Sequence, residues 1–169
     1  MMEKIKLLIG DITKLNVDAI VNAANTSLLG GGGVDGAIHR AAGQKLLEDC
    51  RLLNGCNTGD AKITKGFNLR AKYVIHTVGP IWGDGLHGES QLLESCYWRS
   101  LEVAQENSIR SIAFPNISTG VYRFPKTKAA MIAIDTVKRF LLYSKTIDEV
   151  VFCCFDDENY AIYENLLNC

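Results

Sequence analysis

Four consecutive glycines are the most distinctive chemical feature of the sequence. Gly30 to Gly33 run directly into Val34, Asp35 and Gly36, where a helix is predicted to begin. Without Cβ atoms, this backbone can turn freely and approach a ligand closely. Successive amides can point inward as a nest, and the positive N-terminal end of the helix adds to them. Both features suit a diphosphate. A flexible linker is the alternative, but no Ser-rich tract extends the loop.

Gly31, Gly33 and Gly36 also match the pattern G-x-G-x-x-G of dinucleotide-binding proteins. In that fingerprint the glycines follow directly on a strand, and an acidic residue lies about twenty positions later. Here residues 26–29 separate the predicted strand from the glycines, and the acids nearest that distance fall inside a predicted helix. The pattern therefore does not favour an NAD-dependent dehydrogenase.

Two other segments carry polar groups at predicted strand ends. Residues 116–122 contain small side chains and a glycine, so their amides could grip the same diphosphate from the other side; alone, the segment could be an ordinary turn. Asn22 and Asn25 lie at the end of a different predicted strand. A carboxamide both donates and accepts hydrogen bonds, which suits sugar hydroxyls, although asparagines at such places also form turns.

The elements that must position these loops alternate along the chain. Strands are predicted at 5–9, 19–23, 61–64, 73–78, 111–117 and 149–155, and helices at 34–42, 44–53, 90–106, 126–142 and 158–167. This alternation predicts a largely parallel sheet covered on both faces, with ligands bound outside the carboxyl ends of the strands. We expect an α/β fold, a three-layer α/β/α sandwich with a mixed, mostly parallel central sheet.

Composition and charge limit which kinds of protein this chain can be. The 169 residues are 47% hydrophobic, which suits one domain spanning 1–169 without disulfides or metal. The net charge of −1 argues against a dedicated nucleic-acid binder. No segment reads as a signal peptide or a membrane span. The six cysteines form no C-x-x-C pair, so free thiols in a reducing, cytoplasmic compartment are expected rather than a zinc site.

Six segments together resemble the macrodomain family. They are GDIT (10–13), VNAAN (21–25), GGGGVDGAIHRAAG (30–43), YVIHTVGP (73–80), ISTGVY (117–122) and CFDDENY (154–160). The set looks most like the bacterial O-acetyl-ADP-ribose deacetylase and mono-ADP-ribosyl hydrolase branch, and it covers essentially the whole chain in the right order. The resemblance implies one macrodomain whose ligands are ADP-ribose and O-acetyl-ADP-ribose, with mono-ADP-ribosylated proteins as further partners. It implies no cofactor and no metal, and we expect a monomer.

The resemblance also implies roles for matching residues. Asp11 should accept a hydrogen bond from the adenine amino group, with Ile12 beside it, and Phe155 should stack on the adenine ring. Asn22 and Asn25 should hold the distal ribose, with Tyr122 packed near it. The residues expected to wrap the diphosphate are Gly32, Gly33, Val34, Ser118, Thr119, Gly120 and Val121.

In the same resemblance Asp35 is the catalytic carboxylate, and we place Asn25 and His39 with it in the catalytic group. As a general base, Asp35 would activate a water that attacks an ester carbonyl, an effect typically worth ~10²–10⁴ in rate. A structural helix-capping acid is the alternative. His39 lies four residues later on the same helix face and could orient the carboxylate, or simply pack there. The substrate's own phosphate could instead orient the water. His76 is expected to be structural.

One position departs from the family pattern. Arg123 follows Tyr122 where the family usually has glycine, so its guanidinium could reach the diphosphate or the ester, or it could face solvent on a strained backbone. Two other functions stay open at this stage. One is a reader module that binds ADP-ribose without turnover, and the other is a regulator that contacts RNA or a ribonuclease.

Overall fold

The computed structural model describes residues 2–168, and its centre is one six-stranded sheet of order β1-β6-β5-β2-β4-β3. Every neighbouring pair is parallel except β3 and β4, which are antiparallel. The strands are β1 (Ile5–Ile9), β2 (Ala19–Ala24), β3 (Ala61–Lys65), β4 (Tyr73–Val78), β5 (Ser111–Phe114) and β6 (Glu149–Cys154). The prediction of a mixed, mostly parallel sheet is therefore confirmed.

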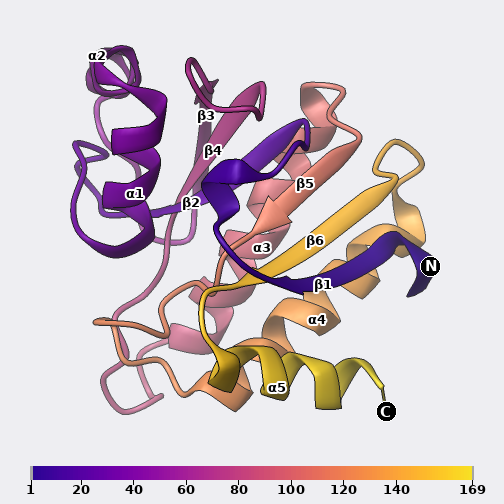
Figure 1. Cartoon of the computed structure of the whole chain (residues 1–169). Helices are drawn as coiled ribbons and strands as arrows, with labels where there is room; N and C mark the ends of the chain where they lie inside the picture. Colours follow the sequence, from indigo (N-terminus) through magenta and orange to yellow (C-terminus); the bar gives the residue numbers. More distant parts are fainter. Residues whose placement is uncertain (1, 169) are drawn as a thin grey trace.

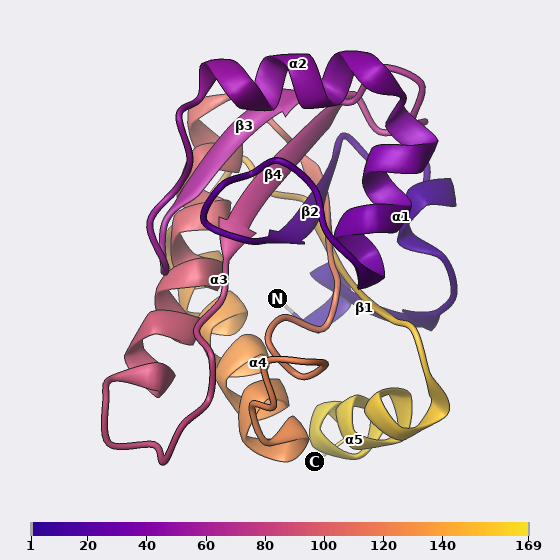
Figure 2. The ribbon, with the colours of Figure 1, turned by 90° about the vertical axis from the view of Figure 1, so that its left-hand side faces the viewer.

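Helices cover both faces of this sheet (Figures 1 and 2). They are α1 (Gly33–Ala42), α2 (Gln44–Leu52), α3 (Glu89–Glu106), α4 (Lys126–Tyr143) and α5 (Asp157–Leu167), with short 3₁₀ turns η1 (Met2–Lys4) and η2 (Ile12–Lys14). Side chains alternate between the faces of a strand, so Val21 packs in the cluster under α3 and α4 while Ile20 packs in the one under α1 and α2. The expected three-layer sandwich is confirmed.

Two predicted strands end earlier than expected. The strand predicted over 111–117 stops at Phe114, because Pro115 has no N–H to continue the ladder. The strand predicted over 149–155 stops at Cys154, which leaves Phe155 outside the sheet. Residues 115–118 and Phe155 are therefore free to form loops at the carboxyl edge. Within residues 2–168, no helix combines the length and the apolar character that crossing a membrane would require.

Candidate active site

The glycine-rich loop connects the end of β2 to the start of α1, and Asn25 holds it in shape. Asn25 Nδ2 donates to the carbonyl of Gly30 at 2.9 Å, while its Oδ1 accepts from the amide of Leu28 at 3.1 Å and from Ser27. Helix α1 begins at Gly33, and Gly32 precedes it without a side-chain cap. The first amides of the helix are thus left for another acceptor.

Two glycines of this segment lie close to neighbouring atoms. A Cβ on Gly36 would lie 2.6 Å from the carbonyl oxygen of Gly31, so α1 packs directly on the loop backbone. A Cβ on Gly31 would lie 3.1 Å from Asp35 Oδ2 and 3.4 Å from Asn25 Nδ2. By contrast, a Cβ on Gly32, Gly33 or Gly120 would meet nothing within 4 Å, so these positions border open space.

Asp35 is a buried carboxylate, 5% exposed, in the first turn of α1. Its Oδ1 accepts a hydrogen bond from Asn22 Nδ2 at 2.8 Å. His39 Nε2 lies 3.4 Å from the same oxygen, without the angle of a hydrogen bond. The structure thus brings together Asp35, Asn22 and His39, whereas a simple helix cap would bond backbone amides of its own turn.

Asn22 lies deeper than a residue at a strand end would suggest. Its side chain is fully buried, and its Oδ1 has no hydrogen-bond partner within the described part of the chain. Leaving a buried acceptor unpaired costs roughly 1–3 kcal/mol. A group retained at such a cost is more readily explained by function than by stability. Contact of Asn22 with a ribose remains a prediction.

A buried histidine continues this network across the sheet. His76 Nδ1 lies 3.1 Å from Asn22 Nδ2, and His76 Nε2 lies 2.9 Å from Thr64 Oγ1. Burial is the main cause that lowers the pKa of His76 to about 3, and electrostatic repulsion from His39 adds to it. His76 is therefore neutral near pH 7. Spacing in the sequence gave no signal for this network, which arises from the register of three strands.

The second candidate phosphate loop follows β5. Ser118 adopts φ +67° and is 8% exposed, and its buried Oγ has no partner among residues 2–168. The loop is closed by a hydrogen bond from the amide of Phe124 to the carbonyl of Ser118 at 2.9 Å. Val121 is 91% exposed at its tip. Thr119 and Gly120 lie between these two residues, so the loop presents backbone amides and little side-chain bulk.

Arg123 ends this loop and also adopts a left-handed backbone, with φ +64°. Its side chain is exposed and makes no polar contact with the described residues. The carbonyl of the neighbouring Tyr122 accepts from the amide of Trp82 at 2.8 Å, which joins this loop to the segment before α3. The positive φ explains why glycine would suit position 123.

At the other end of the sheet edge lie Asp11, Ile12 and Phe155. Asp11 Oδ1 accepts from the amide of Thr13 at 2.9 Å and from its hydroxyl at 2.6 Å. Hydrogen bonding by Thr13 lowers the pKa of Asp11. Phe155 is 87% exposed at the end of β6, while Ile12, the first residue of η2, is buried. An aromatic ring so exposed beside a free carboxylate oxygen is available to a flat, hydrogen-bonding ligand.

One group within residues 2–168 has the spacing of metal ligands. Ligand atoms of Asp84, His87 and Glu89 lie within 4.8 Å of one another. Glu89, however, already accepts from the amides of Gly83 and Gly85 at 3.1 and 2.9 Å and from that of His87 at 2.7 Å. The cluster is thus explained by the folding of the loop before α3.

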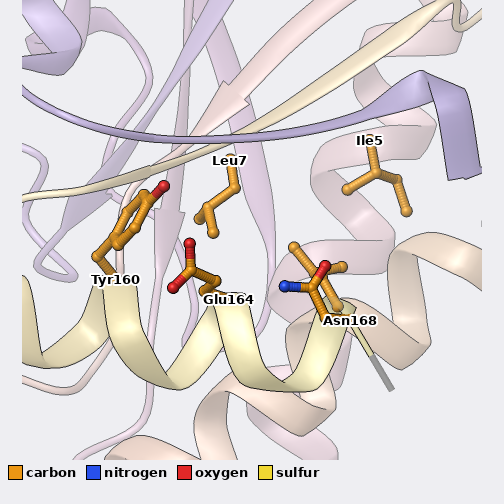
Figure 3. A pocket seen from close by; sticks show the side chains of 6 residues that line it. Ile5, Leu7, Tyr160, Glu164 and Asn168 are labelled. Carbon is orange, nitrogen blue, oxygen red and sulfur yellow. The ribbon is translucent and has the colours of Figure 1, made fainter.

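Two shallow grooves lie elsewhere on the molecule. One, of about 280 Å³, runs between the edge strand β1 and α5 and is lined by Ile5, Leu7, Tyr160, Glu164, Leu167 and Asn168 (Figure 3). The other, of about 340 Å³, lies at the start of α2 beside Phe67. Neither is lined by any predicted site residue.

The fold and the site together define an α/β sandwich with two glycine-containing loops and a buried carboxylate at one sheet edge. Residues 21–133 match the family model described as Macro domain. O-acetyl-ADP-ribose deacetylase 1 of Pantoea vagans is 53% identical to this chain, covering 99% of it and 100% of that protein. The human ADP-ribose glycohydrolase MACROD2 is 56% identical over 98% of this chain, which spans 40% of that longer protein.

A solved structure agrees with these sequence matches. The Trypanosoma brucei macrodomain in complex with ADP-ribose has a TM-score of 0.92 and 46% identity, covering 97% of this chain and 69% of that one. The chain therefore belongs to the macro domain family, and the resemblance drawn from its motifs is confirmed.

Proposed function

We propose that this protein binds ADP-ribose and hydrolyses acyl esters on its distal ribose, with Asp35 activating the water. Two ester substrates fit the proposal: O-acetyl-ADP-ribose, and mono-ADP-ribose attached to Asp or Glu of proteins. The names of the deacetylase and glycohydrolase relatives support a hydrolase. The observation that carries the proposal is the Asp35 carboxylate, which is buried beside Asn22 and His39 and immediately behind the glycine loop.

The ligand would lie along the carboxyl edge of the sheet. Phe155 and Asp11 would take the adenine, the ring by stacking and the amino group by a hydrogen bond to Asp11 Oδ2. The free amides at the start of α1 and those around Gly120 would bind the diphosphate from its two sides. This arrangement leaves the distal ribose near Asn25, Asn22 and Asp35.

In the proposed reaction Asp35 takes a proton from water as the water oxygen bonds to the acyl carbon. Amides of the glycine loop stabilise the oxyanion of the tetrahedral intermediate. Collapse of that intermediate breaks the bond between the acyl carbon and the ribose oxygen, and Asp35 returns the proton to that oxygen. The products are ADP-ribose and a carboxylic acid, either acetic acid or the side chain of a protein Asp or Glu.

Incubating the pure protein with O-acetyl-ADP-ribose and with an ester-modified protein, each with and without chelator, tests the proposal. We expect chelator-resistant turnover, and Asp35→Asn should lower it by ~10²–10⁴ while ADP affinity is kept. ADP binding without turnover of either ester would instead identify a reader module. Turnover by Asp35→Asn within a few-fold of wild type would assign the water to the substrate's phosphate.

A further inference from the structure

A line of polar side chains crosses the otherwise apolar layer between the sheet and helices α1 and α2. Asn22, His76 and Thr64 come from β2, β4 and β3, and register pairs Asn22 with His76. All three are at most 7% exposed. Their neighbours on this face include Ile20, Val74, Val78, Ile38 and Leu46. Polar groups in such surroundings are kept only when their hydrogen bonds are specific.

The proton on each group follows from its partner. A carboxylate only accepts, so the Asn22 atom 2.8 Å from Asp35 Oδ1 must be the donating Nδ2. The second N–H of the same Nδ2 faces His76 Nδ1 at 3.1 Å, and that nitrogen must therefore carry no proton. In neutral imidazole the proton is then on Nε2, which donates to Thr64 Oγ1 at 2.9 Å.

The opposite arrangement does not fit these contacts. With the proton on Nδ1, the histidine would present an N–H to the N–H of Asn22. Turning the carboxamide over would relieve that clash, but it would place Asn22 Oδ1 against Asp35 Oδ1, two acceptors at 2.8 Å. The orientation of the amide and the tautomer of the imidazole are thus coupled, and both follow from Asp35 Oδ1 accepting the hydrogen bond.

We propose that His76 is a positioning residue for Asp35: its Nδ1 holds the Asn22 carboxamide in the orientation that presents an N–H to the carboxylate, and the Thr64 hydroxyl, by accepting from Nε2–H, stabilises the tautomer that does so. The proposal rests on the proposed function for the role of Asp35 as the base. Asn22 Nδ2 restrains Oδ1, which leaves Oδ2, the oxygen next to Gly31, to face the water. A small displacement of such a base can cost up to about a hundredfold in rate.

Three variants separate positioning from simple packing. His76→Leu removes both ring nitrogens. Thr64→Val keeps the side-chain shape but removes the hydroxyl 2.9 Å from Nε2, which leaves that nitrogen only the Cys50 thiol at 3.8 Å. Val74→Ala is the matched control, because Val74 is equally buried on the same face of the same strand and lies outside the network. For His76→Leu we expect kcat for O-acetyl-ADP-ribose to fall about tenfold to a hundredfold, with ADP affinity kept. Thr64→Val should show a smaller decrease.

A second readout does not depend on turnover. Nitrogen-15 NMR of the imidazole should show His76 with its proton on Nε2 in the wild type and a mixture of tautomers in Thr64→Val. An Nδ1–H tautomer in the wild type, or wild-type kcat in folded His76→Leu, would overturn the proposal, as would an equal loss of kcat in Val74→Ala. If His76→Leu does not fold, Thr64→Val decides by the same two readouts. Absence of turnover in the wild type would count against the proposed function alone, and the NMR result would still test the tautomer.

Discussion

Gly31 and Asp35 are so close that a methyl group on the first would press on the second, since a Cβ at position 31 would lie 3.1 Å from Asp35 Oδ2. The Asp35 side chain cannot easily move away, because Asn22 Nδ2 donates a hydrogen bond to its other oxygen, Oδ1. We therefore expect Gly31→Ala to lower the melting temperature and the rate of ester hydrolysis together. Gly32→Ala is the matched control for stability: its φ is −93° and its Cβ would meet open space. Because Gly32 is also the N-cap of α1, where alanine is less favourable than glycine, the entropic gain of about 0.4–1 kcal/mol should be offset and stability should change little. Equal melting temperatures for the two variants would show that Asp35 gives way.

The diphosphate position can be tested at Gly120. A Cβ there meets nothing within 4 Å, so Gly120→Glu should fold normally. It should nevertheless abolish ADP-ribose binding measured by calorimetry, because a negative side chain would stand where phosphate is expected. Gly120→Gln, which adds the same bulk without charge, should retain more affinity. Wild-type affinity in Gly120→Glu would place the phosphates elsewhere.

The adenine assignment depends on Asp11. Asp11→Asn keeps an oxygen to cap η2 through Thr13 but replaces the free carboxylate oxygen with a donor, so ADP-ribose should bind about 1–3 kcal/mol more weakly. The pKa of Asp11 is lowered by its bonds to Thr13, so the carboxylate stays ionised and binding should not change with pH around neutrality. The wild type should also bind the inosine analogue, which lacks the amino donor, more weakly. Equal affinity for both nucleotides would argue against this contact.

Arg123 adopts a left-handed backbone conformation, which is strained for a residue with a Cβ atom. Glycine has no penalty at φ +64°, so Arg123→Gly should stabilise the fold by about 1 kcal/mol and raise the melting temperature. If the guanidinium reaches no ligand atom, affinity for ADP-ribose should be unchanged. A loss of about tenfold, with a weaker salt dependence, would instead reveal a charge-assisted bond to the ligand.

The low pKa of Glu89 predicts that its contribution to the free energy of unfolding decreases in acid. Burial alone would raise the pKa of this carboxyl, but hydrogen bonds from backbone amides, including those of Gly85, His87 and Gly83, lower it to about 2. A depressed pKa stabilises the fold above the unfolded value near 4.3, and this stabilisation is lost as pH falls toward 2. Glu89→Gln should therefore be less stable at pH 7, and the difference in melting temperature from wild type should shrink between about pH 4.5 and 2. A constant difference would rule out this linkage.

The sequence was sufficient for the alternation of strands and helices and for the four-glycine loop, because periodicity and missing Cβ atoms are local properties. It was insufficient where partners come from distant segments. Asn22, predicted at a strand end, proved to be fully buried, because residues of neighbouring strands and of α1 cover it. The contacts among Thr64, His76 and Asn22 depend on the register of three strands, and no spacing along the chain encodes that register.

Buried thiols lie in both hydrophobic clusters of the core, so their reaction with an alkylating reagent can report unfolding. Cys50, Cys96 and Cys154 are fully buried, and burial raises the pKa of all three, to about 11 for Cys50 and Cys96. Alkylating reagents attack the thiolate, so these side chains should react only when the chain opens around them. Cys50 lies on α2 and Cys96 on α3, with both side chains facing the core. Pulsed alkylation read by mass spectrometry would therefore time the opening of the two faces separately, with no probe added to the molecule.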